Sequence, residues 1–200
     1  MVGIMRCELI SWSEVQRLCQ KLARLVRASE FHPDFVIAIG RGGYVPARLL
    51  CDYLGIMALT SIKIEHYLRG AEKQKSAVIR YPLHTDIMSQ RVLLVDDVND
   101  SGDTLEVAVQ HLQTFQPADI RTAVIHDKTS TAFSVDYHGR KIVKWRWLIY
   151  PWAVCEDITE FLKRLSPQPQ TLAEAQRQLA ARYGITIPEP RLKTICAFMD

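Results

Sequence analysis

An apolar run passes directly into acids, hydroxyls and a glycine in the segment VLLVDDVNDSGDTL, residues 92–105. An ordinary turn needs only a glycine and one Asn or Asp, so turn chemistry alone does not explain this composition. The backbone amides of residues 101–104 lead into a helix expected from Leu105. With the helix N-terminus and the hydroxyls of Ser101 and Thr104, they can form an anion-binding nest. This arrangement suits a phosphate monoester.

Asp96 and Asp97 need a different partner, because carboxylates repel phosphate. They are natural acceptors for the hydroxyls of a sugar or for waters on Mg²⁺. In an open parallel sheet, ligands bind beyond the carboxyl ends of the strands, where residues 96–104 are expected to project. One loop therefore offers groups for a phosphate and for ribose hydroxyls together.

A second loop, in IAIGRGGYVPA at residues 37–47, ends another apolar run with Gly-Arg-Gly-Gly. The glycines let the backbone approach an anion closely, and Arg41 brings positive charge. Alone, this segment would be read as an ordinary strand-to-helix turn. Beside the first loop, it favours a second anion site.

Together the two loops resemble the type I phosphoribosyltransferases, and among them the purine enzymes for hypoxanthine, guanine and xanthine. VLLVDDVNDSGDT is similar to the phosphoribosyl pyrophosphate signature of that family in residue types and spacing. The resemblance implies that the phosphoribosyl group is bound by Asp96, Asp97, Asp100, Ser101, Gly102, Asp103 and Thr104. It implies that pyrophosphate is bound by Gly40, Arg41, Gly42 and Gly43, with a cis peptide bond between the first two.

Two later segments, AVIHDK and WLIYPW, resemble the base-binding elements of the purine enzymes. The resemblance implies that Lys128 contacts the 6-oxygen of the base, that Trp147 stacks on the ring, and that the Leu148 backbone lies nearby. Each side chain has an ordinary alternative. A lysine after a strand is usually a solvated loop residue, and a tryptophan in an apolar strand usually belongs to the core.

The implied reaction joins a 6-oxopurine to phosphoribosyl pyrophosphate with the help of Mg²⁺, held by Asp96 and Asp97 directly or through water. Arg41 is expected to offset charge on the departing pyrophosphate. Asp100 lies between the ribose-binding acids and the phosphate loop, so we expect it to accept or relay a proton from the purine. The alternative role for Asp100 is to cap the following helix.

The chain departs from the family pattern in two places. The hypoxanthine-guanine enzymes carry a Ser-Tyr pair in a mobile loop that closes over pyrophosphate, and residues 67–86 contain no such pair. We expect this stretch to be irregular and to act as a mobile lid. Bacterial relatives often have an acid directly after the Pro-Trp, where this chain has Ala153, although Glu156 and Asp157 follow.

Hydrophobic periodicity predicts the elements that position these residues. Ser11 and Glu14 form a capping box for the first helix, and Gly55 can close the second. Helices are expected at 11–29, 45–55, 105–115 and 172–184, and strands at 35–40, 56–65, 91–97, 120–126 and 145–150.

Alternation of strands and helices predicts an α/β fold with a mainly parallel twisted sheet and helices on both faces. The resemblance adds a small hood. We expect the phosphoribosyltransferase domain to span residues 1–165, with a linker and a short helical C-terminal extension at 166–200.

The net charge of +3 comes from acids and bases that are mixed along the chain, so we expect no nucleic-acid partner. No apolar stretch approaches the roughly 20 residues of a membrane span, and no secretory signal is evident, so we expect a cytoplasmic protein that does not bind membranes. Five scattered cysteines indicate reduced thiols, with Cys19 and Cys51 in the core, and the six histidines form no zinc pattern. We expect a homo-oligomer, whose size the sequence does not set.

Two alternatives stay open. A regulator that binds phosphoribosyl pyrophosphate without catalysis would need a nucleic-acid module, and only about thirty-five residues flank the core at either end. An enzyme of the same class with another acceptor, such as adenine or a pyrimidine, would use Lys128 and Trp147 differently.

Overall fold

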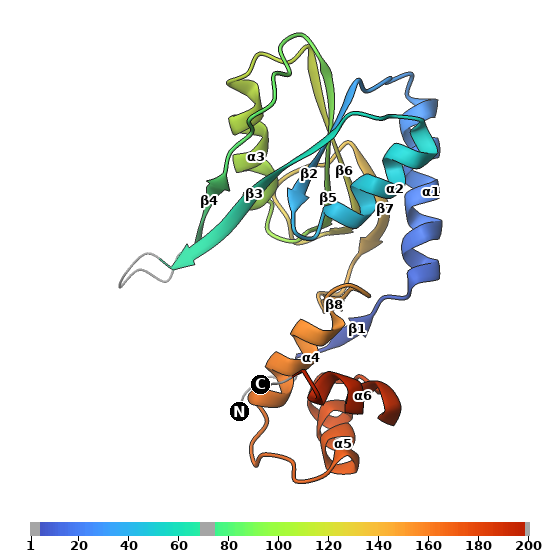
Figure 1. Ribbon diagram of the computed structural model, residues 1–200, viewed down its shortest axis with the longest axis vertical. Coiled ribbons are helices and arrows are strands. Elements are labelled where there is room, and N and C mark those ends of the chain that lie inside the picture. Colours follow the sequence, from blue (N-terminus) through green and yellow to red (C-terminus); the bar gives the residue numbers. More distant parts are fainter. Residues whose placement is uncertain (1–4, 69–74, 199–200) are drawn as a thin grey trace. The chain divides into compact units, whose positions relative to one another are not determined.

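A computed structural model describes residues 5–68 and 75–198 of the chain (Figure 1). The chain divides into two compact units, one of residues 15–144 and the other combining residues 1–14 with 145–200. In the described parts of the chain, no helix combines the length and the apolar character that crossing a membrane requires.

A six-stranded sheet in the order β4-β3-β2-β5-β6-β7 forms the centre of the larger unit. Its strands are β2 (Phe35–Gly40), β3 (Leu59–Leu68), β4 (Lys75–Tyr81), β5 (Arg91–Asn99), β6 (Asp119–Lys128) and β7 (Tyr137–Ile142). The helices of this unit are most of α1 (Trp12–Ala28), together with α2 (Tyr44–Leu54) and α3 (Asp103–Gln113). Every strand pair is parallel except β3 with β4. The predicted α/β fold with a mainly parallel sheet is confirmed.

Helices cover both faces of this sheet, as predicted (Figure 1). On one face, α1 and α2 form a core with the strands that includes Leu22, Val26, Val36, Ala38, Leu50, Leu93 and Val95. On the other face, α3 packs in a second core that includes Ile37, Ile39, Leu94, Leu105, Ala108, Leu112 and Val124. Successive residues of β2 therefore face different helices, which explains why this strand is apolar throughout.

Local signals set the helix ends where the sequence predicts them. The Glu14 backbone N–H donates to the Ser11 hydroxyl at 3.1 Å, which is half of the predicted capping box. Gly55 closes α2 with a φ of 74°, a left-handed conformation that glycine adopts without steric cost.

Cys19 and Cys51 are buried in the core, as predicted, and burial raises the pKa of the Cys19 thiol to about 12.

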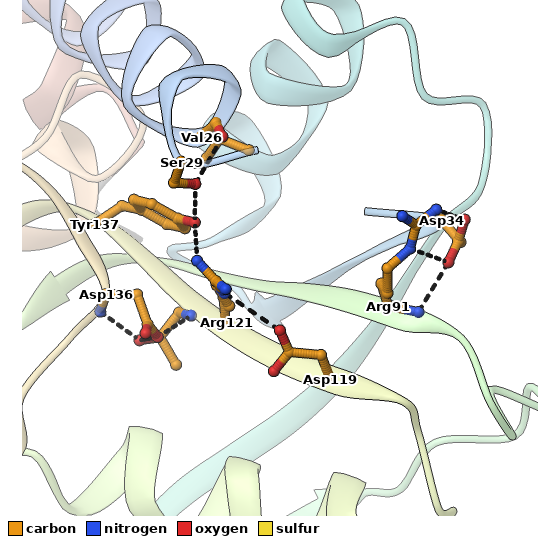
Figure 2. A network of polar contacts seen from close by, with 9 residues as sticks. Val26, Ser29, Asp34, Arg91, Asp119, Arg121, Asp136 and Tyr137 are labelled. Carbon is orange, nitrogen blue, oxygen red and sulfur yellow. Dashed lines mark hydrogen bonds and ion pairs between the residues drawn. The ribbon is translucent and has the colours of Figure 1, made fainter. Parts of the chain in front are cut away.

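Polar side chains fasten the amino ends of the parallel strands (Figure 2). The Arg91 guanidinium donates to both carboxylate oxygens of Asp34, at 2.7 and 3.0 Å, so the residue before β2 is tied to the first residue of β5. These hydrogen bonds hold the pKa of Asp34 down at about 2. On β6, Arg121 bridges Asp119 and the Tyr137 hydroxyl. These contacts fix the positions of the strands at their amino ends, opposite to the end where the predicted site lies.

The smaller unit is built around a two-stranded parallel sheet, in which β1 (Cys7–Leu9) pairs with β8 (Trp147–Ile149). Its helices are α4 (Val154–Lys163), α5 (Leu172–Tyr183) and α6 (Glu189–Cys196). The rings of Phe161 on α4 and Tyr183 on α5 stack with centroids 4.3 Å apart. Residues after 166 thus share a core with α4, and the domain border expected at 165 stays a prediction.

Two details differ from the sequence expectations. The stretch at 67–86, expected to be irregular, contains β4, which pairs antiparallel with β3. Its β-branched residues Val78 and Ile79 favour a strand, and the charges around them obscured this signal. The strand expected at 145–150 exists as the shorter β8, outside the main sheet. A mobile lid at 67–86 stays a prediction, since residues 69–74 lie outside the described ones.

Candidate active site

The two predicted anion loops leave the sheet from neighbouring strands. β2 and β5 pair in parallel, with Ala38 opposite Val95, and each turns into a helix at its carboxyl end. Residues 41–43 therefore lie beside the loop that follows β5. The peptide bond between Gly40 and Arg41 is cis, as the resemblance implies. Arg41 itself is exposed.

The glycines of the first loop allow it to touch the acidic end of β5. A Cβ atom added at Gly42 would lie 2.5 Å from the carboxylate of Asp97. A Cβ atom at Gly43 would overlap the backbone carbonyl oxygens of Val95 and Ile39. At Gly43 only a residue without a side chain fits, and at Gly42 a side chain would displace the Asp97 carboxylate. Glycine at these positions therefore lets the two loops come into direct contact.

Asp96 and Asp97 form a close acidic pair at the end of β5. Asp96 is 8% exposed, and its Oδ1 accepts a hydrogen bond from the Asp97 backbone N–H at 2.9 Å. Burial raises the pKa of Asp96 well above its ordinary value, and the neighbouring Asp97 charge raises it further. A divalent cation would relieve this repulsion, and carboxylate oxygens are ligands that suit Mg²⁺.

The acidic pair by itself does not make a complete metal site. Within residues 5–68 and 75–198, no group of three or more His, Cys, Asp or Glu side chains is arranged to hold a metal ion. Mg²⁺ commonly keeps several waters and binds through one or two carboxylates together with substrate phosphates. The residues present fit this mode of binding and no closed protein cage.

Lys128 and Asp100, which are 28 positions apart in the chain, form an ion pair. The Lys128 ammonium donates to Asp100 Oδ2 at 2.7 Å, and the lysine side chain is 3% exposed. Adjacent strands bring them together, because Asn99 at the end of β5 lies opposite Asp127 on β6. Lys128 is thus a buried strand residue, and the solvated-loop alternative is wrong. Helix α3 has Gly102 as its N-cap, and Asp100 turns toward Lys128.

The predicted phosphate loop borders a cavity of about 190 Å³. The lining residues are His66, Asp96, Asp97, Val98, Asn99, Asp100, Ser101, Gly102, Thr104 and Leu105. The Ser101 hydroxyl donates to Asp103 at 3.0 Å. Gly102 has a φ of 99°, and an added Cβ atom would lie 2.6 Å from the Phe133 side chain. The cavity is small, and most of its lining residues have polar side chains.

A buried asparagine anchors the phosphate loop to the segment between β6 and β7. The Asn99 amide donates to Asp127 and to the Phe133 carbonyl oxygen, each at 2.9 Å, and its oxygen accepts from Thr131. Asn99 was not among the site residues predicted from the sequence. Its place in the sequence, between the predicted ribose-binding acids and the predicted phosphate loop, is the feature that could have indicated a role.

His66 was also not among the site residues predicted from the sequence. It lies on β3, and its Nε2 is 3.0 Å from the Thr104 hydroxyl. A single histidine in a strand belongs to no motif, so the sequence alone indicates no role for it. The fold does, because β3 pairs with β2 and His66 contacts Thr104.

The predicted base-contacting residues Trp147 and Leu148 lie in the smaller unit, so their relation to Lys128 stays a prediction. Trp147 is 40% exposed, which argues against the core alternative, while Leu148 is buried. The indole Nε1 of Trp147 donates to Asp157 at 3.0 Å. Burial raises the pKa of Asp157 to about 6, against the lowering effect of this hydrogen bond.

Comparison with known proteins agrees with this geometry. Residues 9–157 match the family model of the phosphoribosyl transferase domain. The xanthine-guanine phosphoribosyltransferase of Cereibacter sphaeroides is 31% identical over 158 residues, covering 76% of this chain and 89% of that protein. The hypoxanthine-guanine phosphoribosyltransferase of Saccharomyces cerevisiae is 28% identical over 190 residues, with coverage of 72% and 85%.

A solved structure gives the same result. The purine phosphoribosyltransferase from Pyrococcus horikoshii Ot3 is 34% identical and superimposes with a TM-score of 0.66, covering 74% of this chain and 94% of that one. The family match spans both anion loops, the acidic pair and the buried lysine. On this evidence the chain belongs to the phosphoribosyl transferase domain family.

Proposed function

We propose that this protein is a Mg²⁺-dependent enzyme of purine salvage. It transfers the 5-phosphoribosyl group from phosphoribosyl pyrophosphate to a 6-oxopurine, which is hypoxanthine, guanine or xanthine, and releases pyrophosphate. The observation that carries the proposal is the ion pair between Lys128 and Asp100 beside the two anion loops. The names of the similar hypoxanthine-guanine and xanthine-guanine enzymes support the acceptor class.

Each part of phosphoribosyl pyrophosphate has a matching group at the carboxyl ends of the strands. The loop at 101–104 binds the 5′-phosphate through backbone amides and hydroxyls. Asp96 and Asp97 accept hydrogen bonds from the ribose hydroxyls. The loop at 40–43 binds pyrophosphate, with Arg41 supplying charge. The contact between Gly42 and Asp97 supports this assignment, because it brings the pyrophosphate loop against the ribose acids.

Asp96 and Asp97 would hold Mg²⁺, directly or through water. When bound, Mg²⁺ would offset negative charge on the departing pyrophosphate. The raised pKa of Asp96 supports this role, since it reflects carboxylates crowded in a buried place that a cation would stabilise.

Transfer needs one bond to form, one to break and one proton to leave. A ring nitrogen of the purine bonds to the anomeric carbon as the bond from that carbon to the pyrophosphate oxygen breaks. The proton leaves the base for the Asp100 carboxylate. The Lys128 ammonium has three donors, so it can keep Asp100 in position and still donate to the 6-oxygen. Trp147 stacks on the ring, with its indole oriented by Asp157.

The proposal includes a homo-oligomer in the cytoplasm, which size-exclusion chromatography and cell fractionation test. The catalytic claim is tested by pyrophosphate release from phosphoribosyl pyrophosphate with a panel of nucleobases, in Mg²⁺ and after chelation. We expect release with at least one 6-oxopurine, very little with adenine or orotate, and none in excess chelator. Tight binding of phosphoribosyl pyrophosphate without turnover on any base would favour the non-catalytic regulator.

A further inference from the structure

The predicted phosphate loop lacks positive charge of its own. Residues 96–104 contain four acids and no Lys or Arg. The Ser101 hydroxyl already donates its hydrogen bond to one of these acids, Asp103. Backbone amides and the N-terminus of α3 attract a phosphate, but the carboxylates around it oppose the binding of a dianion. A further donor with a positive charge would offset this repulsion.

His66 is the side chain in a position to supply that charge. Among the described residues that line the cavity of about 190 Å³, it is the one with a basic side chain. It reaches the cavity from β3, whereas the other lining residues come from β5, α3 and the turn between them. Its Nε2 lies 3.0 Å from the hydroxyl of Thr104, the residue that ends the phosphate loop.

We propose that His66 is a further ligand of the 5′-phosphate, which it contacts through Nε2 next to the Thr104 hydroxyl. This inference rests on the proposed function, because it deepens the assignment of the loop at 101–104. When the phosphate is present, the hydroxyl of Thr104 and the N–H of His66 both donate to it. One substrate group is thereby held by a helix N-terminus and by a neighbouring strand.

Binding of ribose 5-phosphate and of pyrophosphate, measured separately by calorimetry, tests this role. His66→Ala should weaken ribose 5-phosphate by about 10- to 100-fold, the range for a lost hydrogen bond to a charged group. It should leave pyrophosphate unchanged, because that ligand uses the loop at 40–43. His66→Gln, which keeps a donor without the charge, should fall between the two proteins. His32→Ala is the matched control, since His32 is exposed and precedes β2 at the opposite edge of the sheet.

A double-mutant cycle with Thr104→Val sharpens the test. If both side chains hold one phosphate, the losses from the two substitutions should not be additive. Unchanged ribose 5-phosphate binding in His66→Ala would overturn the role of His66, and so would equal weakening of both ligands. Failure of the unmodified protein to bind ribose 5-phosphate or phosphoribosyl pyrophosphate at all would instead overturn the proposed function.

Discussion

Substitution of Gly42 by alanine tests whether the pyrophosphate loop and the ribose acids act as one site. The added Cβ atom would lie 2.5 Å from the Asp97 carboxylate. Non-bonded carbon and oxygen atoms settle at about 3.5 Å, so the carboxylate must move by about 1 Å. The obstacle is the end of a side chain, which can rotate at a cost of about 0.5–1.5 kcal/mol. The fold should therefore survive.

The catalytic rate should be affected more than the stability of the fold. A misplacement of about 1 Å in a group that positions substrate can lower the rate by about 10²-fold. We expect Gly42→Ala to lose about that factor in kcat/KM with phosphoribosyl pyrophosphate, measured by pyrophosphate release. Its free energy of unfolding in urea should change by no more than the rotamer cost.

Gly43→Ala provides the contrast, because its Cβ atom would meet backbone carbonyl oxygens of Val95 and Ile39. Paired strands cannot rotate away as a side chain does, so overpacking should cost about 1–3 kcal/mol of unfolding free energy or more. A Gly42→Ala protein with unchanged kcat/KM would refute the reasoning. So would a Gly42→Ala protein that is destabilised as much as Gly43→Ala.

Other substitutions give separate expectations. Asp100→Asn should lower kcat by about 10²- to 10⁴-fold and weaken phosphoribosyl pyrophosphate binding much less; unchanged kcat would remove Asp100 from proton transfer. Lys128→Gln should narrow the preference for 6-oxopurines over adenine in steady-state assays, because an amide both donates and accepts; an undiminished preference would refute this. Because the pKa of Asp157 is raised to about 6, the folded chain holds this proton more tightly than the unfolded chain between pH 3.8 and about 6. The contribution to stability should be complete below this window and lost as pH rises through it. Asp157→Asn should remove that part of the pH dependence in denaturant titrations, and an identical pH profile would contradict the assignment.

The strand-loop-helix segments could be predicted because each carries a strong local signal. The apolar run at 35–40 ends in glycine, and the run at 92–95 ends in two acids. Both strands are buried on two faces by helices, so they lack the alternation of a half-exposed strand. The loops that follow them contain the residues of the candidate site, and the family resemblance depended on those same local features.

The elements that were not predicted depend on partners far away in the chain. β1 has only three residues and pairs with β8, which is far away in the chain, so β1 shows no period of its own. β7 contains charged residues and glycine, and it is recognised as a strand only through its pairing with β6. The ion pair of Lys128 with Asp100 and the contact of His66 with Thr104 are likewise products of the fold.

The most direct test is the ratio of kcat/KM for the best of hypoxanthine, guanine and xanthine over that for adenine, with phosphoribosyl pyrophosphate as donor. The Lys128 ammonium only donates, so it can satisfy a 6-oxygen but meets another donor in the amino group of adenine. Sites built around such a hydrogen bond can reject the mismatched base by roughly 10⁴- to 10⁵-fold. We predict a ratio of about 10⁴ or more. A ratio near one, or a preference for adenine, would contradict the assignment of this site to 6-oxopurines.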